Sequence, residues 1–260
     1  MSQWNAADYA RNSKGQERWG RELIEQLGVR DDDDVLDIGC GDGQLTAAIA
    51  ELTSGVVVGV NSSSDMVRHA NENHASSRLR YEEGDAAALT FDGAFSLIFS
   101  NAALHWVAGC HSPVVAGIAR AMRPGARALL QMGGEGNGAG IIAAFDAVRS
   151  RPAWAAYFDG FSFPYGFHTP ALYQRWAERA GLNVEDAQII AKDMTYDSRD
   201  AFIGWLRTAW LPFVEPVPTA EREAYLEAVA DAYLAANPAD EDGTIHVDMR
   251  RLQVRLSKPA

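Results

Sequence analysis

The sequence predicts an α/β fold in which helices cover both faces of a mostly parallel, doubly wound sheet. Apolar segments of strand length alternate with segments whose apolar residues recur at helical spacing. Several of these strand-like segments are continuously apolar, as expected for strands that are buried on both faces. One of them, Val35–Ile38, leads directly into a glycine-rich turn. This alternation implies parallel strands joined by crossover helices.

The elements of the first half follow from the apolar spacing. In residues 16–27, apolar side chains lie three and four positions apart, which predicts an amphipathic helix ahead of the sheet. Residues 56–60 form a continuous apolar run, and residues 62–73 have the pattern of a helix with serines that can cap it. Further strands are expected at residues 35–38, 79–83, 95–100 and 127–132, and a helix at residues 44–51.

The organisation changes near residue 135. A glycine-rich stretch at 133–138 indicates a loop, and the aromatic-rich segment 154–167 follows it. Beyond this segment the pattern predicts helices at 170–180, 199–211 and 219–236, and strands at 184–194 and 245–256.

Length and composition narrow the class of protein. A chain of 260 residues can form one large domain or a domain with an insertion. The formal charge of −12 disfavours nucleic acid, whose phosphates require basic contacts. Two cysteines, Cys40 and Cys110, give no disulfide framework, and no signal peptide or membrane span is evident. We therefore expect a cytoplasmic protein without a membrane or nucleic-acid partner, whose oligomeric state the sequence leaves open.

The turn after the first strand is the most informative feature. Gly39, Gly41 and Gly43 stand at alternate positions. Glycine lets the backbone turn tightly and approach a ligand that a Cβ would keep away. The G-x-G-x-G spacing differs from the dinucleotide fingerprint, and no Gly-Lys-Ser or Gly-Lys-Thr ending of a phosphate loop follows. Because Asp42 would repel a pyrophosphate, the turn suits a cationic or neutral adenosyl ligand better.

This turn resembles the first motif of the class I S-adenosylmethionine-dependent methyltransferases. The resemblance implies a Rossmann-like fold with S-adenosyl-L-methionine as cofactor, bound beyond the carboxyl ends of the strands. Glu83–Ala86 resembles the third landmark of the family, in which an aspartate accepts from the adenine amino group. In these loops the resemblance implies the cofactor-binding residues Asp37, Gly39, Cys40, Gly41, Gln44, Asn61, Ser62, Met66, Gly84, Asp85 and Ala86.

Asn61 departs from the family pattern, in which an acidic residue at the end of the second strand accepts from both ribose hydroxyls. An asparagine offers one acceptor and one donor, and its hydrogen bonds are weaker than those of a carboxylate. Asn61 is thus a tolerated substitution helped by Ser62 and Ser63, a cause of lower cofactor affinity, or a sign of an unusual cofactor.

The string Ser100–Val107 follows the fourth predicted strand. It resembles the corresponding stretch of the methyltransferases that act on trans-aconitate, malonyl carrier protein and juvenile hormone acid, all of which methylate carboxylates. The resemblance implies that Ser100 and Asn101 contact the methionine part of the cofactor. It also implies that His105 and Trp106 face the acceptor, so both are catalytic candidates, with His105 close to the cofactor as well. Trp106 fits a core position equally well.

The N-terminal string resembles the leading helix of these enzymes, in which a tyrosine and a glutamine close over the cofactor. Tyr9 and Gln16 are the corresponding residues. We therefore expect a cofactor-binding core with an N-terminal lid helix over residues 1–135. An acceptor-binding region and the final strands of the sheet are expected over residues 136–260.

Acceptor contacts are expected from the second half of the chain. The aromatic segment 154–167 and the helix around residues 205–210 supply apolar surface. Arg207, Arg250 and Arg251 each have the chemistry to bind a carboxylate with two hydrogen bonds, although arginines of an acidic protein usually make surface pairs.

The predicted function is methyl transfer from S-adenosylmethionine to a small molecule, with a carboxylate oxygen as the favoured acceptor. A carboxylate is already ionised at neutral pH, whereas a hydroxyl or amine acceptor would use His105 as a base. N-, C- or hydroxyl O-methylation and a non-catalytic cofactor-binding module are the alternatives. No metal site is implied, because neither an acidic cluster nor a Cys/His ligand spacing can be assigned.

Overall fold

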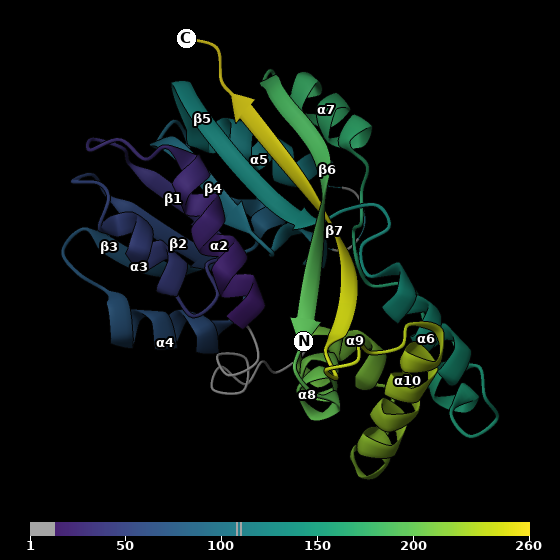
Figure 1. Cartoon of the computed structure of the whole chain (residues 1–260). Coiled ribbons are helices and arrows are strands. Elements are labelled where there is room, and N and C mark those ends of the chain that lie inside the picture. The colour runs from purple at the N-terminus through teal and green to yellow at the C-terminus, as the bar shows by residue number, and fades with distance from the viewer. Residues whose placement is uncertain (1–13, 108, 110) are drawn as a thin grey trace. The chain divides into compact units, whose positions relative to one another are not determined.

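The computed structural model describes all residues of the chain except 1–13, 108 and 110, and of residues 14–18 it describes only the backbone (Figure 1). The chain forms two compact units. Of the described residues, unit 1 contains 14–15, 136–164 and 191–250. Unit 2 consists of residues 16–135, 165–190 and 251–260.

A seven-stranded sheet has the order β3-β2-β1-β4-β5-β7-β6. Strands β1 to β5 pair in parallel, and β7 runs antiparallel to β5. This confirms the prediction of a mostly parallel α/β sheet. The strands are β1 (Val35–Ile38), β2 (Val57–Asn61), β3 (Leu79–Glu83), β4 (Phe95–Asn101), β5 (Met122–Gly133), β6 (Asn183–Tyr196) and β7 (Ile245–Ser257).

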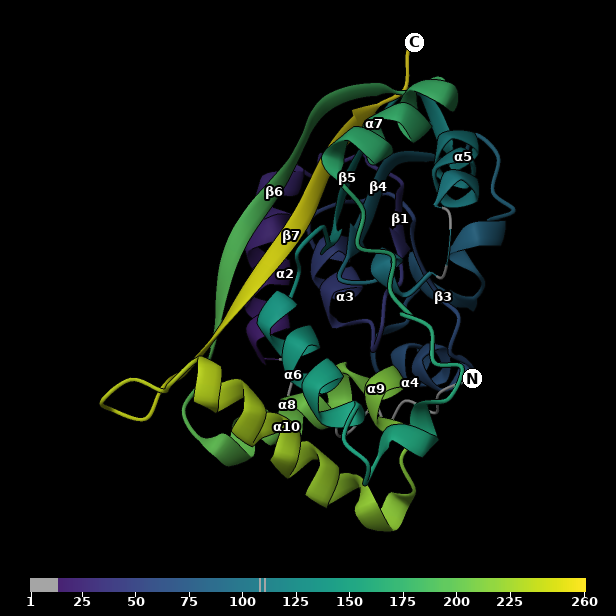
Figure 2. The ribbon, with the colours of Figure 1, turned by 90° about the vertical axis from the view of Figure 1, so that its right-hand side faces the viewer.

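Helices cover both faces of the sheet within unit 2, as Figures 1 and 2 show. Apolar side chains such as Leu23 and Ile49 fill one core, between the sheet and the first three helices. Ile118 and Trp176 belong to the core on the other face. The helices of the first face are α2 (Lys14–Leu27), α3 (Gln44–Ala50) and α4 (Ser64–His74), and those of the second are α5 (Ser112–Ala121) and α7 (Pro170–Arg179).

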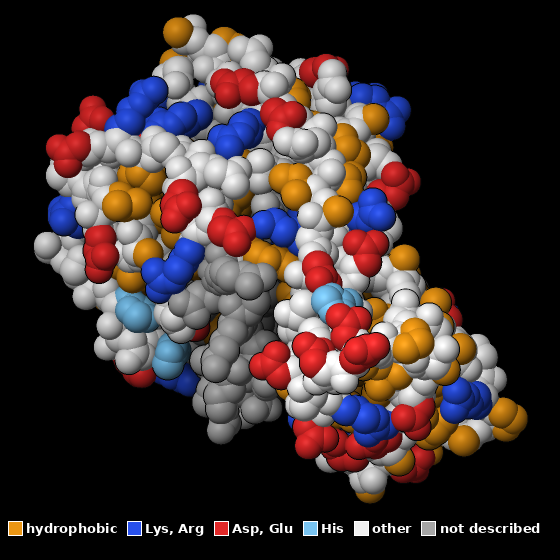
Figure 3. All heavy atoms as spheres, viewed as in Figure 1, with side chains coloured by type: hydrophobic (Ala, Val, Ile, Leu, Met, Phe, Trp, Pro, Cys, Tyr) orange, Lys and Arg blue, Asp and Glu red, His pale blue; other side chains and the backbone are white. Residues whose placement is uncertain are grey.

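Unit 1 is built around aromatic side chains. The rings of Phe145 and Phe213 stack with their centroids 4.8 Å apart, and Tyr225 and Phe202 are fully buried. Acidic side chains gather over α8 and α10 on the face drawn in Figure 3. The helices of this unit are α6 (Ala139–Arg149), α8 (Arg199–Ala209), α9 (Leu211–Val214) and α10 (Arg222–Ala236).

The strands lie where the sequence predicts them, within a few residues, while two helices were not predicted. Helix α5 begins with a proline in its first turn, and α6 buries apolar side chains at helical spacing, so both carry a recognisable signal. The predicted helix at 199–211 ends at residue 209, and α9 begins after Trp210. None of the described helices has the length and apolarity that a bilayer crossing requires.

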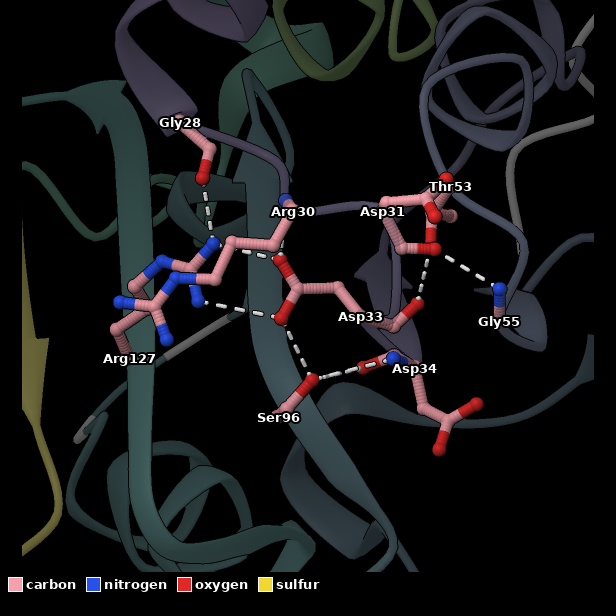
Figure 4. Close-up of polar contacts among 9 residues, drawn as sticks. All are labelled: Gly28, Arg30, Asp31, Asp33, Asp34, Thr53, Gly55, Ser96 and Arg127. Atoms are coloured by element: carbon pink, nitrogen blue, oxygen red, sulfur yellow. Dashed lines mark hydrogen bonds and ion pairs between the residues drawn. The ribbon is translucent and has the colours of Figure 1, made fainter.

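A largely buried ion pair links β5 to the amino ends of β1 and β4 in unit 2 (Figure 4). The Asp33 carboxylate accepts hydrogen bonds from the Arg127 guanidinium at 2.6 and 3.2 Å, from the Ser96 hydroxyl at 2.8 Å and from the Arg30 N–H at 2.7 Å. Burial alone would raise the pKa of Asp33, but the hydrogen bonds and the charge of Arg127 lower it below its ordinary value. The network therefore fixes the beginnings of β1 and β4 against the middle of β5.

Candidate active site

The glycine turn after β1 combines two tightly packed glycines with an open one. All three have positive φ angles, +82° at Gly39, +58° at Gly41 and +89° at Gly43. A Cβ on Gly39 would lie 2.0 Å from the Ala103 side chain, and one on Gly43 would lie 2.8 Å from the Tyr81 ring. Among the described residues, a Cβ on Gly41 would meet no atom within 4 Å. The main chain at Gly41 thus faces open space that a side chain would fill, which fits close approach by a ligand.

The side chains of this turn hold it in place from beneath. Asp37 is buried and accepts a 2.6 Å hydrogen bond from the Thr46 hydroxyl. Burial raises the pKa of Asp37 to about 7, although the Thr46 bond opposes this shift. Cys40 is also buried, and Gln44 donates to the Asp42 carboxylate at 2.8 Å. Asp37 and Cys40 are thus shielded from a ligand, whereas the main chain at Gly41 and the side chains of Asp42 and Gln44 are only half-buried.

At the end of β2, Asn61 already uses its carbonyl oxygen. This oxygen accepts from the Ser63 N–H at 2.9 Å. The Ser63 hydroxyl accepts from the Met66 N–H at 3.4 Å and so caps the beginning of α4. Asn61 can then offer a ribose its amide NH₂ and the second lone pair of its carbonyl oxygen. Ser62 is exposed, whereas Met66 is 4% exposed and packs as a core residue.

The loop after β3 is a short capped turn. The exposed Asp85 accepts from the Ala87 N–H at 2.8 Å and caps a 3₁₀ helix at Ala86–Ala88. Gly84 lies close to β2, because its N–H donates to the Asn61 carbonyl at 3.0 Å. Asn61 and Gly84 therefore lie side by side at the carboxyl ends of β2 and β3.

The loop after β4 begins with a strained residue. Ala102 has a φ of +53°, a left-handed conformation that a residue with a Cβ rarely adopts. Its N–H donates to the Gln131 carbonyl at 2.8 Å. The preceding Ser100 is fully buried and donates its hydroxyl to the Ile38 carbonyl at 2.7 Å. Asn101 lies next to α2, since a Cβ on Gly20 would come within 3.0 Å of its amide nitrogen.

His105 follows this strained turn and is buried, with 9% of its surface exposed. Its Nδ1 accepts a hydrogen bond from the Gly133 N–H at 3.4 Å, which leaves Nε2 as the protonated nitrogen. Burial and the charges of Arg251 and His111 lower the pKa of His105 well below its ordinary value. His105 is therefore a neutral imidazole that can donate a hydrogen bond from Nε2.

Three aromatic rings surround His105. The ring centroids of Trp106, Tyr165 and Phe167 lie 5.7, 6.0 and 5.9 Å from that of His105. Tyr165 and Phe167 stack at 5.2 Å, and the Gly166 N–H between them donates to the His105 carbonyl at 2.9 Å. The structure thus brings both catalytic candidates together with two residues of the predicted aromatic segment.

Other residues of the aromatic segment belong to the core of unit 1. Trp154 and Phe158 pack against Tyr225, with ring centroids 5.5 and 5.6 Å apart. Phe161 packs against Phe213 at 5.0 Å. The sequence does not distinguish these core rings from Tyr165 and Phe167, because all have the same apolar character.

The three candidate arginines differ in how far they are buried. Arg207 makes two hydrogen bonds to the Glu223 carboxylate, at 2.9 and 2.8 Å, and Arg250 binds Asp248 at 3.3 Å. Both arginines are partly exposed to solvent. Arg251, in contrast, is 3% exposed. Only this arginine of the three is buried in the part of the chain that the structure describes.

Two residues at the end of β5 were not predicted. Gly133 provides the N–H that orients His105, and Gln131 is a polar residue with 3% exposure in an otherwise apolar strand. The glutamine within the run Ala128–Met132 was the sequence signal for this position, because a polar side chain in a buried strand needs a partner.

Tyr9 lies outside the described residues, and for Gln16 only the backbone is described.

A separate cavity of about 550 Å³ lies within unit 1. His246 lines it and binds Asp193 at 2.7 Å and Asp240 at 3.1 Å, and these hydrogen bonds and charges raise the pKa of the histidine. Of the predicted cofactor-binding residues whose side chains the structure describes, none lines this cavity.

The mostly parallel sheet and the open glycine turn after its first strand are the features of a methyltransferase domain. The family model described as "Methyltransferase domain" matches residues 35–125. The chain is thus a class I S-adenosylmethionine-dependent methyltransferase, with S-adenosyl-L-methionine as its cofactor, and it is an enzyme as the sequence predicts.

Among its relatives is an uncharacterized methyltransferase of Schizosaccharomyces pombe, 28% identical over 96% of both chains. A trans-aconitate 2-methyltransferase of an Azoarcus species is 28% identical over 94% of both chains. The fold resembles that of the YcgJ protein from Bacillus subtilis, with a TM-score of 0.63 at 18% identity over 94% of this chain and 99% of the other. It also resembles a geranyl diphosphate methyltransferase in complex with S-adenosylmethionine, with a TM-score of 0.55 at 16% identity over 93% and 84% of the two chains.

Proposed function

We propose that this enzyme methylates a carboxylate oxygen of a small molecule. The observation that carries the proposal is the state of His105. A general base must accept a proton and become charged, but burial and the nearby Arg251 disfavour the imidazolium. The Gly133 N–H also occupies Nδ1, the nitrogen that would accept the proton. An acceptor that is already ionised matches such a site.

Bound S-adenosylmethionine supplies an electrophilic methyl group, and a carboxylate oxygen that attacks it forms the ester while the C–S bond breaks with its electrons passing to sulfur. No proton moves in this reaction. The protein has to align the acceptor and exclude water. The Nε2–H of His105 can orient the acceptor, and the rings of Trp106, Tyr165 and Phe167 can keep water away from it.

The relatives favour the same acceptor chemistry, because several of them are trans-aconitate 2-methyltransferases. We infer the corresponding division of labour along the chain. Residues 1–135 bind the cofactor, with the loops after β1 to β4 contributing the contacts. Residues 136–260 contribute to acceptor binding, through Tyr165, Phe167 and Arg251. Methylation of a hydroxyl or amine is the alternative, and it requires a base.

The test is transfer of a labelled methyl group from S-adenosylmethionine to a panel of acids. The panel contains trans-aconitate, fumarate, succinate, glutarate and citrate, with crotonate and butyrate as monocarboxylates. Esters release labelled methanol in base, whereas methyl ethers and methylamines do not. Transfer only to amines or hydroxyls would contradict the proposal, and tight cofactor binding without any product would favour a non-catalytic module.

The pH dependence of the rate gives a second test. With saturating S-adenosylmethionine and a carboxylate acceptor, we expect kcat/KM for the acceptor to be flat between about pH 6 and 9, because the acceptor is ionised and His105 is neutral throughout this range. His105→Gln should retain much of the activity, since its amide can donate in place of Nε2. A rate that rises with a pKa near neutrality and loses this limb in His105→Gln would identify a base and overturn the proposal.

A further inference from the structure

His111 is a fully buried histidine at the N-cap position of α5. Its Nε2 lies 3.2 Å from the Val107 carbonyl oxygen, and its Nδ1 lies 2.6 Å from the Tyr173 hydroxyl. Since a carbonyl oxygen can only accept, Nε2 carries a proton and donates it to Val107. His111 therefore connects α7, which carries Tyr173, to the end of the turn that carries His105 and Trp106.

The charge states of the two side chains fix the direction of both hydrogen bonds. Burial and the neighbouring His168 lower the pKa of His111 to about 4, so the ring is neutral at neutral pH and its Nδ1 is an acceptor. Burial also raises the pKa of the Tyr173 hydroxyl, which keeps its proton and donates it to Nδ1. Each nitrogen of His111 thus has one partner with one role, and the ring has one orientation.

The same ring supports a second segment of unit 2. A Cβ on Gly166 would lie 2.3 Å from Nε2 of His111 and 2.9 Å from Nε2 of His168, so Gly166 packs directly on these rings. The Gly166 N–H donates to the His105 carbonyl at 2.9 Å. Gly166 also lies between the two stacked aromatic residues that flank His105. The position of the His111 ring therefore sets the position of this segment.

The turn needs such support because its backbone is strained. It begins at Ala102, whose φ of +53° persists only where the surrounding structure enforces it. The Ala102 N–H is tied to the Gln131 carbonyl at 2.8 Å, and the 3₁₀ helix Leu104–Trp106 follows. Val107, which ends this helix, is tied to His111. The turn is thus held at both ends.

We infer that His111 is a positioning residue that holds the two sides of the proposed acceptor site, the turn of His105 and the segment of Gly166, in one arrangement. This inference rests on the proposed function, because it takes His105 as the residue that orients the acceptor. It does not depend on which atom of the acceptor is methylated. Loss of His111 should misalign a bound acceptor and leave the cofactor site intact.

Two substitutions that each keep one hydrogen bond provide the test. The amide of His111→Gln reaches the position of Nε2 and can still donate to the Val107 carbonyl, whereas that of His111→Asn reaches only the position of Nδ1. With the best acceptor, we expect kcat to fall by about 50-fold in His111→Asn and by less than about fivefold in His111→Gln. In both variants KM for the acceptor should change by less than about threefold, and the Kd of S-adenosylhomocysteine should stay the same.

A histidine that only stabilises the fold gives a different pattern. Both variants would then lose stability, but kcat per folded molecule, counted by the stoichiometry of S-adenosylhomocysteine binding, would be the same in both. Equal kcat values of His111→Asn and His111→Gln would therefore overturn the inference. Weaker binding of S-adenosylhomocysteine by His111→Asn alone would overturn it too, because the residue would then act on the cofactor site.

Gly166→Ala reaches the same ring from the other side. The new methyl group would press on His111, so we expect kcat to fall by about tenfold. Gly117→Ala is the control, because a Cβ at this position of α5 would lie 3.4 Å from its nearest neighbour, and it should keep the wild-type kcat. Should His111→Asn not fold, Gly166→Ala decides, since an unchanged kcat in this variant contradicts the inference.

Failure of the inference and failure of the proposed function give different results. If the wild type methylates carboxylates and the two His111 variants have equal kcat values, only the positioning role is wrong. If the labelled methyl group reaches only a hydroxyl or an amine, the proposed function is wrong, and the same two variants decide the inference on that acceptor. If the wild type forms no product at all, both are wrong.

Discussion

The two ends of β1 carry one aspartate each, in opposite electrostatic settings. Asp33, just before the strand, binds the Arg127 guanidinium and has a lowered pKa. Asp37, inside the strand near its carboxyl end, accepts from the neutral hydroxyl of Thr46 and has its pKa raised to about 7 by burial. The same side chain, four residues apart, is thus stabilised as a carboxylate at one end and destabilised at the other.

This difference shows at which end of the sheet the protein neutralises a buried carboxylate with a cation of its own. At the amino end, the carboxylate has its cation within the fold, so the network contributes to stability. At the carboxyl end, the buried carboxylate, the strained Ala102 and the open main chain at Gly41 are costs to the free protein. S-adenosylmethionine carries a sulfonium and an ammonium group, so a cation reaches this end with the cofactor.

The largest effect is expected at the amino end. Asp33→Asn removes the carboxylate but leaves Arg127 mostly buried, so we expect the free energy of unfolding to fall by about 3 kcal/mol in urea titrations. The contribution of Asp33 is present above its unfolded pKa near 4 and is lost as the pH falls through its lower folded pKa. The variant should therefore lose less stability in acid than the wild type. Unchanged stability at pH 7 would mean that the pair contributes nothing.

Asp37 should show the opposite pH dependence. Its folded pKa of about 7 lies above its unfolded value near 4, so the free protein should lose stability as the pH rises from about 4 to 7, by on the order of 3 kcal/mol. Asp37→Asn should remove this slope. The affinity for cationic S-adenosylmethionine should rise through the same window, as calorimetry at several pH values would detect. A stability curve without this slope in the wild type would contradict the shifted pKa.

Gly41 tests whether the open main chain is the binding surface. Gly41→Leu should weaken S-adenosylmethionine binding by at least about 100-fold, since the new side chain would fill the ligand's space, and reduce stability by about 1 kcal/mol through its positive φ. Gly125→Leu is the matched control, because Gly125 also has a positive φ and a Cβ there would meet no described atom within 4 Å. It should show the same loss of stability and normal binding. Equal binding by both variants would remove the turn from the site.

Asn61 is expected to give the smallest effect. Asn61→Asp keeps an oxygen for the Ser63 N–H and adds a second acceptor for ribose, so we expect S-adenosylmethionine to bind up to about tenfold more tightly. Asn73→Asp introduces the same charge at an exposed position of α4 and should leave the affinity unchanged. Weaker binding by Asn61→Asp alone would mean that Asn61 meets a group other than ribose.

The sequence was sufficient for the sheet and the glycine turn but not for the acceptor side. Apolar runs and turn glycines act locally, so strands such as β3 were predicted at their true bounds. The partners of His105 are Gly133 and Gly166, which lie 28 and more residues away along the chain. The burial of Arg251, in contrast to its neighbour Arg250, depends on the register of β7 against β5. Contacts of this kind leave no local pattern in a sequence.

The reactivity of Cys40 can report how often the glycine turn opens. Its thiol is 7% exposed, and burial together with the charges of Asp37 and Asp42 raises its pKa, so the reactive thiolate is almost absent from the folded turn. Alkylation at this residue requires the turn to open. The rate at which a maleimide labels the peptide containing Cys40, followed by mass spectrometry, therefore measures how often the turn opens, and S-adenosylhomocysteine should slow that labelling.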